Sequence, residues 1–181
     1  ISFVGVAASA TVQSAAQYMR NKGGVVVVSA GNNGIDEGFP STDTMIVVSA
    51  TDSADNRTSW SSYGVFVDLA APGLGIYTTA RGGGYQSASG TSFASPIVAG
   101  VAALVKGMHP EFTAAQVESA LFSSAADLGA TGKDSVYGYG RVSAAGAVAA
   151  AGTPPGDTTA PTVAIAAPTG GSVSGPTTVN V

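Results

Sequence analysis

The stretch QSASGTSFASP (86–96) is followed at once by the apolar run IVAGVAALV (97–105), and this pair decides the fold. Five hydroxyls therefore stand directly before a long apolar segment. Ser and Thr are preferred at helix N-termini, where their oxygens accept hydrogen bonds from unpaired backbone N–H groups. The pattern predicts a buried helix that begins near Ser92 and ends near Pro110, since proline disfavours a helical residue before it. The hydroxyls either cap this helix or include a nucleophile.

Extended and helical patterns alternate in the first half of the chain. A helix is predicted over TVQSAAQYMRNKG (11–23), with Val12, Ala15, Ala16 and Met19 on one face. Buried strands are predicted at ISFVGV (1–6), GVVVVSA (24–30), TMIVVSAT (44–51) and VFVDLAAPG (65–73). A strand, a crossover helix and a second strand form the repeating unit of a parallel sheet, so we expect an α/β fold.

Two further helices follow, and then the composition changes. Thr113 and Gln116 have the spacing of a capping box, which predicts a helix to about Ser124, and residues 142–152 predict a short helix. From Gly152 onward the chain is rich in Pro, Thr and Gly. We therefore place one domain at 1–151, a linker at 152–160 and the first strands of an all-β module at 161–181, too few to close a core.

Composition and charge argue against several kinds of partner and site. The net charge of −4 argues against nucleic acid, which binds to a basic face. The chain has no Cys and one His, so thiolate zinc sites and imidazole-rich metal sites are excluded. The longest apolar run is interrupted by Gly100, Lys106 and Gly107 and is shorter than a bilayer requires. We expect no membrane span.

Two glycine-bearing segments follow apolar runs and are expected to meet in space. VVVVSAGNNG (25–34) leaves a predicted strand at Gly31 and Asn32, and Gly90 precedes the helix that begins near Ser92. Ligands of parallel sheets bind beyond the carboxyl ends of strands and at helix N-termini. The N–H of Ser92 points out of the helix end, and the Asn32 amide supplies a second donor. Together they predict an oxyanion-binding site beside a serine nucleophile.

These segments resemble the subtilisin-like serine proteases, the subtilases of peptidase S8 type. GTSFASP (90–96) is similar to the nucleophile signature of that family. Three further segments resemble segments of the family and follow its order. They are SAGN (29–32), similar to the oxyanion-hole segment, APG (71–73), similar to the segment before the nucleophile, and YGYGRV (137–142), similar to the closing segment. The resemblance covers residues 1–150 and implies a three-layer α/β fold with a mostly parallel sheet flanked by helices.

The resemblance also implies catalytic and substrate-binding roles. Ser92 is the expected nucleophile, and Asn32 is expected to assist in holding the oxyanion. The expected substrate is a polypeptide, which pairs in extended form with an edge strand. The expected substrate-binding residues are Ser2, Phe3 and Val4 in that edge strand, Gly31 and Gly90 where substrate approaches the backbone, and Gly38 in a wall of the pocket for the side chain before the scissile bond. For Phe3, plain core packing is an open alternative.

The base that a serine nucleophile needs is missing from the sequence. The one histidine, His109, lies 17 residues after Ser92, about 25 Å along a helix, and we expect it at an exposed helix end. VSATDS (48–53) superficially resembles the family's catalytic-Asp strand, but Asp52 lacks the glycine that follows that Asp. The family's order is Asp, His, Ser. The resemblance therefore implies a carboxyl-terminal part of a catalytic domain, inactive alone, with the Asp and His segments before Ile1.

The setting of the protein is also implied by the resemblance. It implies a secreted, extracellular monomer without a catalytic cofactor, and structural calcium whose ligands no motif here identifies. The alternative function is a non-catalytic pseudoenzyme or surface-binding module, because DTTAPTV (157–163) resembles the opening of bacterial immunoglobulin-like modules. Asp36, Glu37 and Asp43 either disfavour acidic substrate side chains near the pocket or are solvated loop charges.

Overall fold

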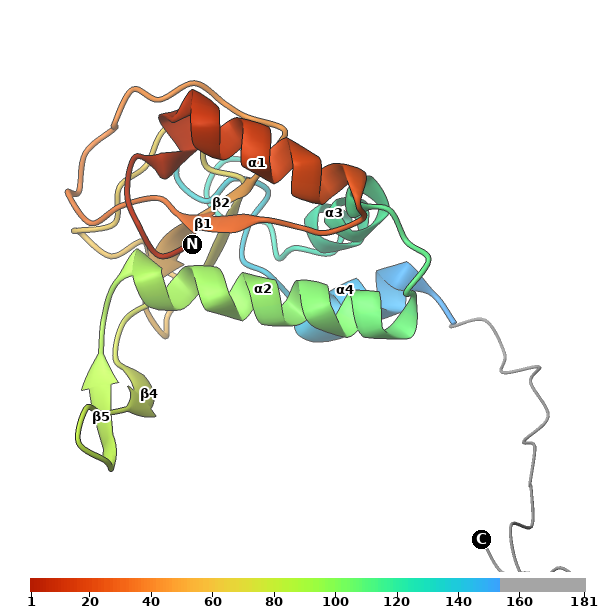
Figure 1. The fold of residues 1–181 in the computed structure, drawn as a ribbon. Helices are drawn as coiled ribbons and strands as arrows, with labels where there is room; N and C mark the ends of the chain where they lie inside the picture. Colours follow the sequence, from red (N-terminus) through yellow and green to blue (C-terminus); the bar gives the residue numbers. More distant parts are fainter. Residues whose placement is uncertain (154–181) are drawn as a thin grey trace, which may run out of the picture.

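A parallel sheet lies at the centre of the computed structural model, which describes residues 1–153 (Figure 1). Its strands, in spatial order, are β1 (Val27–Ser29), β2 (Ile46–Thr51) and β3 (Leu69–Pro72). The parallel register pairs Val28 with Val47 and Ser49 with Ala70. This arrangement confirms the predicted α/β fold. The all-β module expected at 161–181, and the linker expected before it beyond residue 153, lie outside the described residues.

Helices cover both faces of the sheet and make three layers. In Figure 1, α1 (Ala10–Asn21) lies above the sheet, and α2 (Thr91–Met108) lies below it with α4 (Ala144–Ala151). Alternate strand residues divide between the two faces: Val27 packs with α2, whereas the next residue, Val28, packs with Ala16 of α1. Each strand is thus buried on both sides, which explains why the strand sequences are continuous apolar runs.

The long helix α2 begins and ends as the sequence predicts. It packs against all three strands and against α3 (Ala114–Ser123) and α4. The capping box predicted at Thr113 and Gln116 is present at the start of α3. With a mean hydropathy of 1.3, α2 is the one helix within residues 1–153 that is long and apolar enough to cross a membrane. Here it is a core helix, and the absence of a membrane span stays a prediction.

The predicted face of α1 is only partly buried. Ala16 is 3% exposed, but Met19 is 51% exposed. The helix stops where predicted, because Gly23 adopts a φ of 81° that glycine tolerates without strain. Around the helix, an open apolar surface is formed by Ile1, Val12, Ala15, Ala16, Tyr18, Met19 and Val26.

The strand predicted at ISFVGV (1–6) is absent, so that prediction was wrong. The first residue alone lies along β1: the amino group of Ile1 donates to Val27 O, and Ser29 N donates to Ile1 O. Gly5 then adopts a φ of 76° and turns the chain into a short 3₁₀ helix at Val6–Ala8. Periodicity could not reveal this turn, because an apolar run that contains one glycine also fits a strand.

The prediction that His109 is an exposed residue was also wrong. His109 does follow α2 directly, but it is only 4% exposed. Its ring stacks on Phe112 with centroids 4.2 Å apart, and its Nδ1 lies 2.9 Å from Glu111 Oε1. A turn at residues 110–111, in which Phe112 N donates to His109 O at 3.0 Å, brings Phe112 over the imidazole. The sequence showed the helix end but not this cover.

A two-stranded antiparallel hairpin that the sequence analysis missed lies between β3 and α2. It consists of β4 (Ile76–Thr79) and β5 (Tyr85–Ala88) and projects from the body in Figure 1. Tyr77 and Tyr85 stack on it with ring centroids 5.4 Å apart, and both are exposed. The three glycines at 82–84 were the available signal, since successive glycines favour a tight turn between strands.

The closing segment at 137–142 continues the sheet beside β3. Tyr139 N donates to Asp68 O, and Ala70 N donates to Gly140 O. This close approach requires glycine at position 138. A Cβ there would lie 2.1 Å from the carbonyl carbon and oxygen of Asp68, and the φ of 61° also favours glycine.

We therefore expect Gly138→Ala to lower the free energy of unfolding by at least about 2 kcal/mol more than Gly132→Ala, because its new methyl group overlaps backbone. Gly132 is the matched control: its φ is 83°, and no atom lies within 4 Å of its Cβ position. Urea unfolding of both variants measures the difference. Equal losses would show that the contact with Asp68 relaxes without cost.

Asp68 is a buried carboxylate immediately before β3. Its Oδ1 accepts a hydrogen bond from Lys133 Nζ at 2.8 Å, and its Oδ2 accepts one from Val47 N at 2.9 Å. Burial raises the pKa of Asp68 above its ordinary value of 3.8, although Lys133 and the Val47 N–H act in the opposite direction. The unfolded chain therefore releases this proton at a lower pH than the folded protein does.

From this shift we expect Asp68 to lower the free energy of unfolding as the pH rises from 3.8 toward the folded-state pKa, since the folded protein holds more protons in that window. Below 3.8 this contribution disappears. In Asp68→Asn, the fall in the free energy of unfolding that Asp68 causes above pH 3.8 should be missing. The control is Asp52→Asn. N–H groups of Asn56 and Ala54 lower the pKa of Asp52, so this group raises the free energy of unfolding as the pH rises toward 3.8, and the substitution should remove that rise. Urea unfolding at several pH values tests this, and parallel profiles for wild type and Asp68→Asn would contradict it.

Candidate active site

The ends of β1 and β3 converge on the start of α2. After β3, Gly73 O accepts a hydrogen bond from Gly90 N at 2.8 Å. After β1, Gly31 N donates to Thr91 Oγ1 at 3.2 Å. The N-cap Gly90 and the first residue of α2, Thr91, are therefore each tied to the end of one strand, and Ser92 follows them as a half-buried residue.

Asn32 is oriented by two hydrogen bonds from one residue. Its Oδ1 accepts from Thr91 N at 2.9 Å and from Thr91 Oγ1 at 2.8 Å. Because a backbone N–H can only donate, the amide oxygen must face Thr91, and the Nδ2 group must face away from it. Thr91 is 1% exposed, so its two donors are shielded, whereas the rest of Asn32 is exposed.

Two donors flank the space beside Gly90. A Cβ at Gly90 would lie 3.4 Å from Asn32 Nδ2 and 3.7 Å from Ser92 N. Since Gly90 has no side chain, no atom of its own separates the two donors from this point. Two N–H donors that meet beside a serine hydroxyl are the arrangement that stabilises a negatively charged oxygen.

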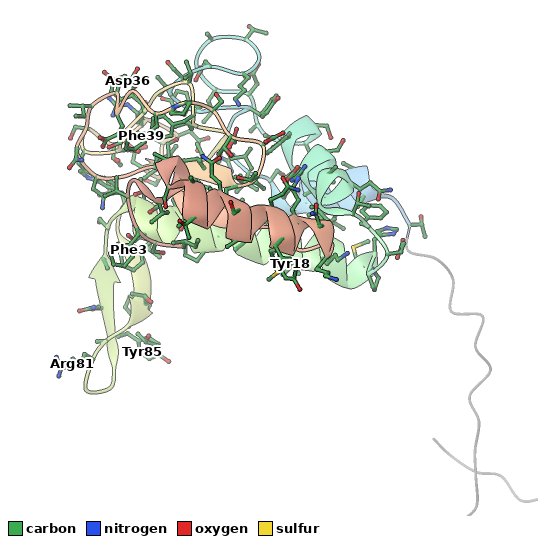
Figure 2. All side chains as sticks on the ribbon, turned by 45° about the horizontal axis from the view of Figure 1, so that its top comes forward. Phe3, Tyr18, Asp36, Phe39, Arg81 and Tyr85 are labelled. Atoms are coloured by element: carbon green, nitrogen blue, oxygen red, sulfur yellow. The ribbon has the colours of Figure 1, made fainter. Side chains whose placement is uncertain are left out.

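The first residues of the chain lie in front of Ser92. Ser2 Oγ donates to Ser92 O at 3.0 Å, and Ser92 Oγ lies 3.5 Å from Ser2 O, at the limit of a hydrogen bond. Phe3 and Val4 are 73% and 47% exposed, so the core-packing alternative for Phe3 does not hold among the described residues. Figure 2 shows Phe3 where the hairpin joins the body.

Gly31 and Gly38 differ in what surrounds them. Gly31 is buried, and a Cβ there would lie 2.6 Å from Val4 Cγ2 and 3.0 Å from Ser62 Oγ. Gly38 is exposed, has a φ of 66° and has no atom within 4 Å of its Cβ position. The Val4 side chain therefore covers Gly31, whereas Gly38 lies open on the following loop.

Two titratable residues that the sequence analysis weighed, His109 and Asp52, lie away from this cluster. His109 follows the last residue of α2, whereas Ser92 lies in its first turn. Asp52 closes an exposed turn through N–H groups of Ala54 and Asn56. Within residues 1–153, no three Asp, Glu or His side chains gather to hold a metal ion, and we assign no calcium ligands.

Three residues of this region were not singled out for their contacts by the sequence analysis. Thr91 orients Asn32, and its place between Gly90 and Ser92 was the available signal. Ser62 and Glu37 meet beside Gly31 through a hydrogen bond of 2.7 Å. Their positions, 25 residues apart in the sequence, gave no signal of this contact.

Comparison with known proteins agrees with this geometry. The family model described as the subtilase family, peptidase S8, matches residues 4–140. Alkaline elastase YaB of Bacillus sp. (strain YaB) is 41% identical over 140 residues, which cover 76% of this chain and 36% of that protein. Subtilisin BL of Lederbergia lenta is 39% identical over 138 residues, which cover 75% of this chain and 50% of that protein. The chain thus spans half or less of the length of these relatives.

Solved structures show the same likeness. A lanthipeptide protease superposes with a TM-score of 0.69 at 31% identity, over 76% of this chain and 54% of that chain. A protease from Pseudoalteromonas arctica superposes with a TM-score of 0.71 at 36% identity, over 79% of this chain and 47% of that chain. The family model covers most of the chain, and the fold agrees with it. The chain therefore belongs to the subtilase family.

Proposed function

We propose that this chain carries the nucleophile and the oxyanion hole of a serine endopeptidase. Ser92 attacks the carbonyl carbon of a peptide bond, and the resulting oxyanion lies between Asn32 Nδ2 and the Ser92 N–H. The observation that carries this proposal is that these two donors lie within 4 Å of one point beside Gly90, a residue without a side chain. Donors already in place need no reorganisation when the charge develops, which is why such sites accelerate acyl transfer.

The substrate is a polypeptide that approaches along Ser2–Val4. This segment is exposed and lies against Ser92 through the Ser2 hydrogen bond. An extended substrate laid beside it brings its scissile carbonyl to the two donors. In the proposed complete protease, Gly90 gives the carbonyl room to approach, and Gly38 borders the side chain before the scissile bond.

The base that takes the Ser92 proton comes from outside these 181 residues. The only histidine in the sequence, His109, is separated from Ser92 by the length of α2, about 25 Å at the rise of an α-helix. Its imidazole is also enclosed by Phe112 and Glu111. We propose that the complete protease supplies a base and the group that orients it, and that it acts as a secreted monomer, as the family resemblance implies.

In the complete protease that contains these residues, we expect Ser92→Ala to lower kcat by about 10⁶-fold, the magnitude known for subtilisin, itself a member of this family. Ser87→Ala is the matched control, because its hydroxyl lies in the same stretch and is exposed on β5. Hydrolysis of a peptide amide and labelling by a serine-directed phosphonate are the measurements. A protein that binds peptides yet shows no turnover or labelling that depends on Ser92 would be a pseudoenzyme, and the proposal would be wrong.

For the second donor we expect Asn32→Ala to lower kcat by about 100- to 1,000-fold with little change in KM, again the range known for subtilisin. The reason is that the amide contacts the oxyanion and not the ground-state carbonyl oxygen. Asn21→Ala, at the exposed end of α1, is the control. A rise in KM at constant kcat would instead assign Asn32 to ground-state binding.

A further inference from the structure

We propose that Glu37 makes this protease select Lys or Arg immediately before the scissile bond. The inference rests on the proposed function, since it assigns the substrate class of the same site. It concerns a carboxylate that the sequence leaves open as either a specificity element or a solvated loop charge.

The Glu37 carboxylate lies beside both neighbours of Asn32. Its Oε1 accepts a hydrogen bond from Asn33 Nδ2 at 2.9 Å. The same oxygen would lie 3.3 Å from a Cβ at Gly31. A residue five positions further along the loop thus returns to the turn that holds the proposed oxyanion donor.

Ser62 fixes the carboxylate in this place. The Ser62 N–H donates to Gly31 O at 2.9 Å, and its hydroxyl accepts from Asn33 N at 3.1 Å. The hydroxyl proton is then directed to Glu37 Oε1 at 2.7 Å. The carboxylate is therefore held by the same residue that braces the Gly31–Asn33 turn, which is unlike a freely rotating surface charge.

The charge of Glu37 is not neutralised within residues 1–153. Both groups bound to Oε1 are neutral, and none of the four ion pairs there includes Glu37. The guanidinium of Arg57 is instead bound to the carbonyls of Thr58 and Ser61 and lies over the Tyr63 ring.

The surroundings also suit the long apolar stem of a Lys or Arg side chain. Val4 Cγ2 covers Gly31, and Val4 and Phe3 are both exposed. Figure 2 shows Phe3, Phe39 and Asp36 along one side of the molecule. Such stems pack on apolar side chains while the charged end reaches an acceptor. An ionised carboxylate next to apolar walls favours a cation over a neutral side chain of equal length.

The test uses the complete protease and peptides that differ only in the residue before the cleaved bond: Lys, Arg, Met or Glu. Met is the neutral, unbranched reference for Lys. We expect kcat/KM for Lys to exceed that for Met by about 10- to 100-fold, with the preference weakened at high salt. In Glu37→Gln the Lys-to-Met ratio should fall toward one, and in Glu37→Lys the Glu peptide should be cleaved faster than the Lys peptide.

Asp36→Asn is the matched control, since this neighbouring carboxylate is exposed and bonded to the backbone of its own loop. It should change the Lys-to-Met ratio by less than about 3-fold, as expected for a screened surface charge. The inference is overturned if Glu37→Gln leaves the Lys-to-Met ratio unchanged, or if it lowers kcat/KM equally for all four peptides. In either case, turnover that depends on Ser92 would still support the proposed function. No Ser92-dependent turnover of any peptide overturns both.

Discussion

The amide oxygen of Asn32 accepts two hydrogen bonds from Thr91, and the rest of the site depends on this contact. It joins the turn after β1 to the first residue of α2, two segments 59 positions apart in the chain. It also determines which end of the Asn32 amide faces outward, because the oxygen is occupied by donors. Two partly buried bonds to one buried residue hold this orientation. The sheet and the helix together thus position the two donors, Asn32 Nδ2 and the Ser92 N–H.

Much of the fold was predictable from the sequence, and the failures have physical reasons. The strands buried on both faces give continuous apolar runs, so β1, β2 and β3 were located, and so were α1, α2 and the capped helix α3. The segment at 1–6 failed because one glycine with a positive φ ends its extension, and His109 failed because its cover comes from Phe112. Local patterns describe periodicity and caps. They carry no information on which later residue folds over an earlier one.

The candidate site likewise has a part that the sequence predicted and a part that it did not. The positions of Ser92 and Asn32 followed from the ends of apolar runs, because parallel strands and helix N-termini meet at one edge of a sheet. The partners that orient and tune these residues were not accessible. Thr91, Ser62 and Glu37 act through contacts across the loops, and each contact depends on side-chain geometry that the sequence does not encode locally. The sequence therefore predicted the proposed reacting residues, but not the contacts of the residues that hold and flank them.

The hairpin β4–β5 is closed at its base by two bonds that do not involve its tip. Gly75 N donates to Ser89 Oγ at 2.9 Å, and Gly90 N donates to Gly73 O at 2.8 Å. The two chain segments at the base of the hairpin are therefore bonded to each other. We expect that a change in the length of β4 and β5 leaves the start of α2 in place. Loop tips of this kind tolerate insertions. The fold thus contains a modular appendage that evolution or engineering can lengthen, shorten or replace beside the nucleophile without rebuilding the helix that carries it.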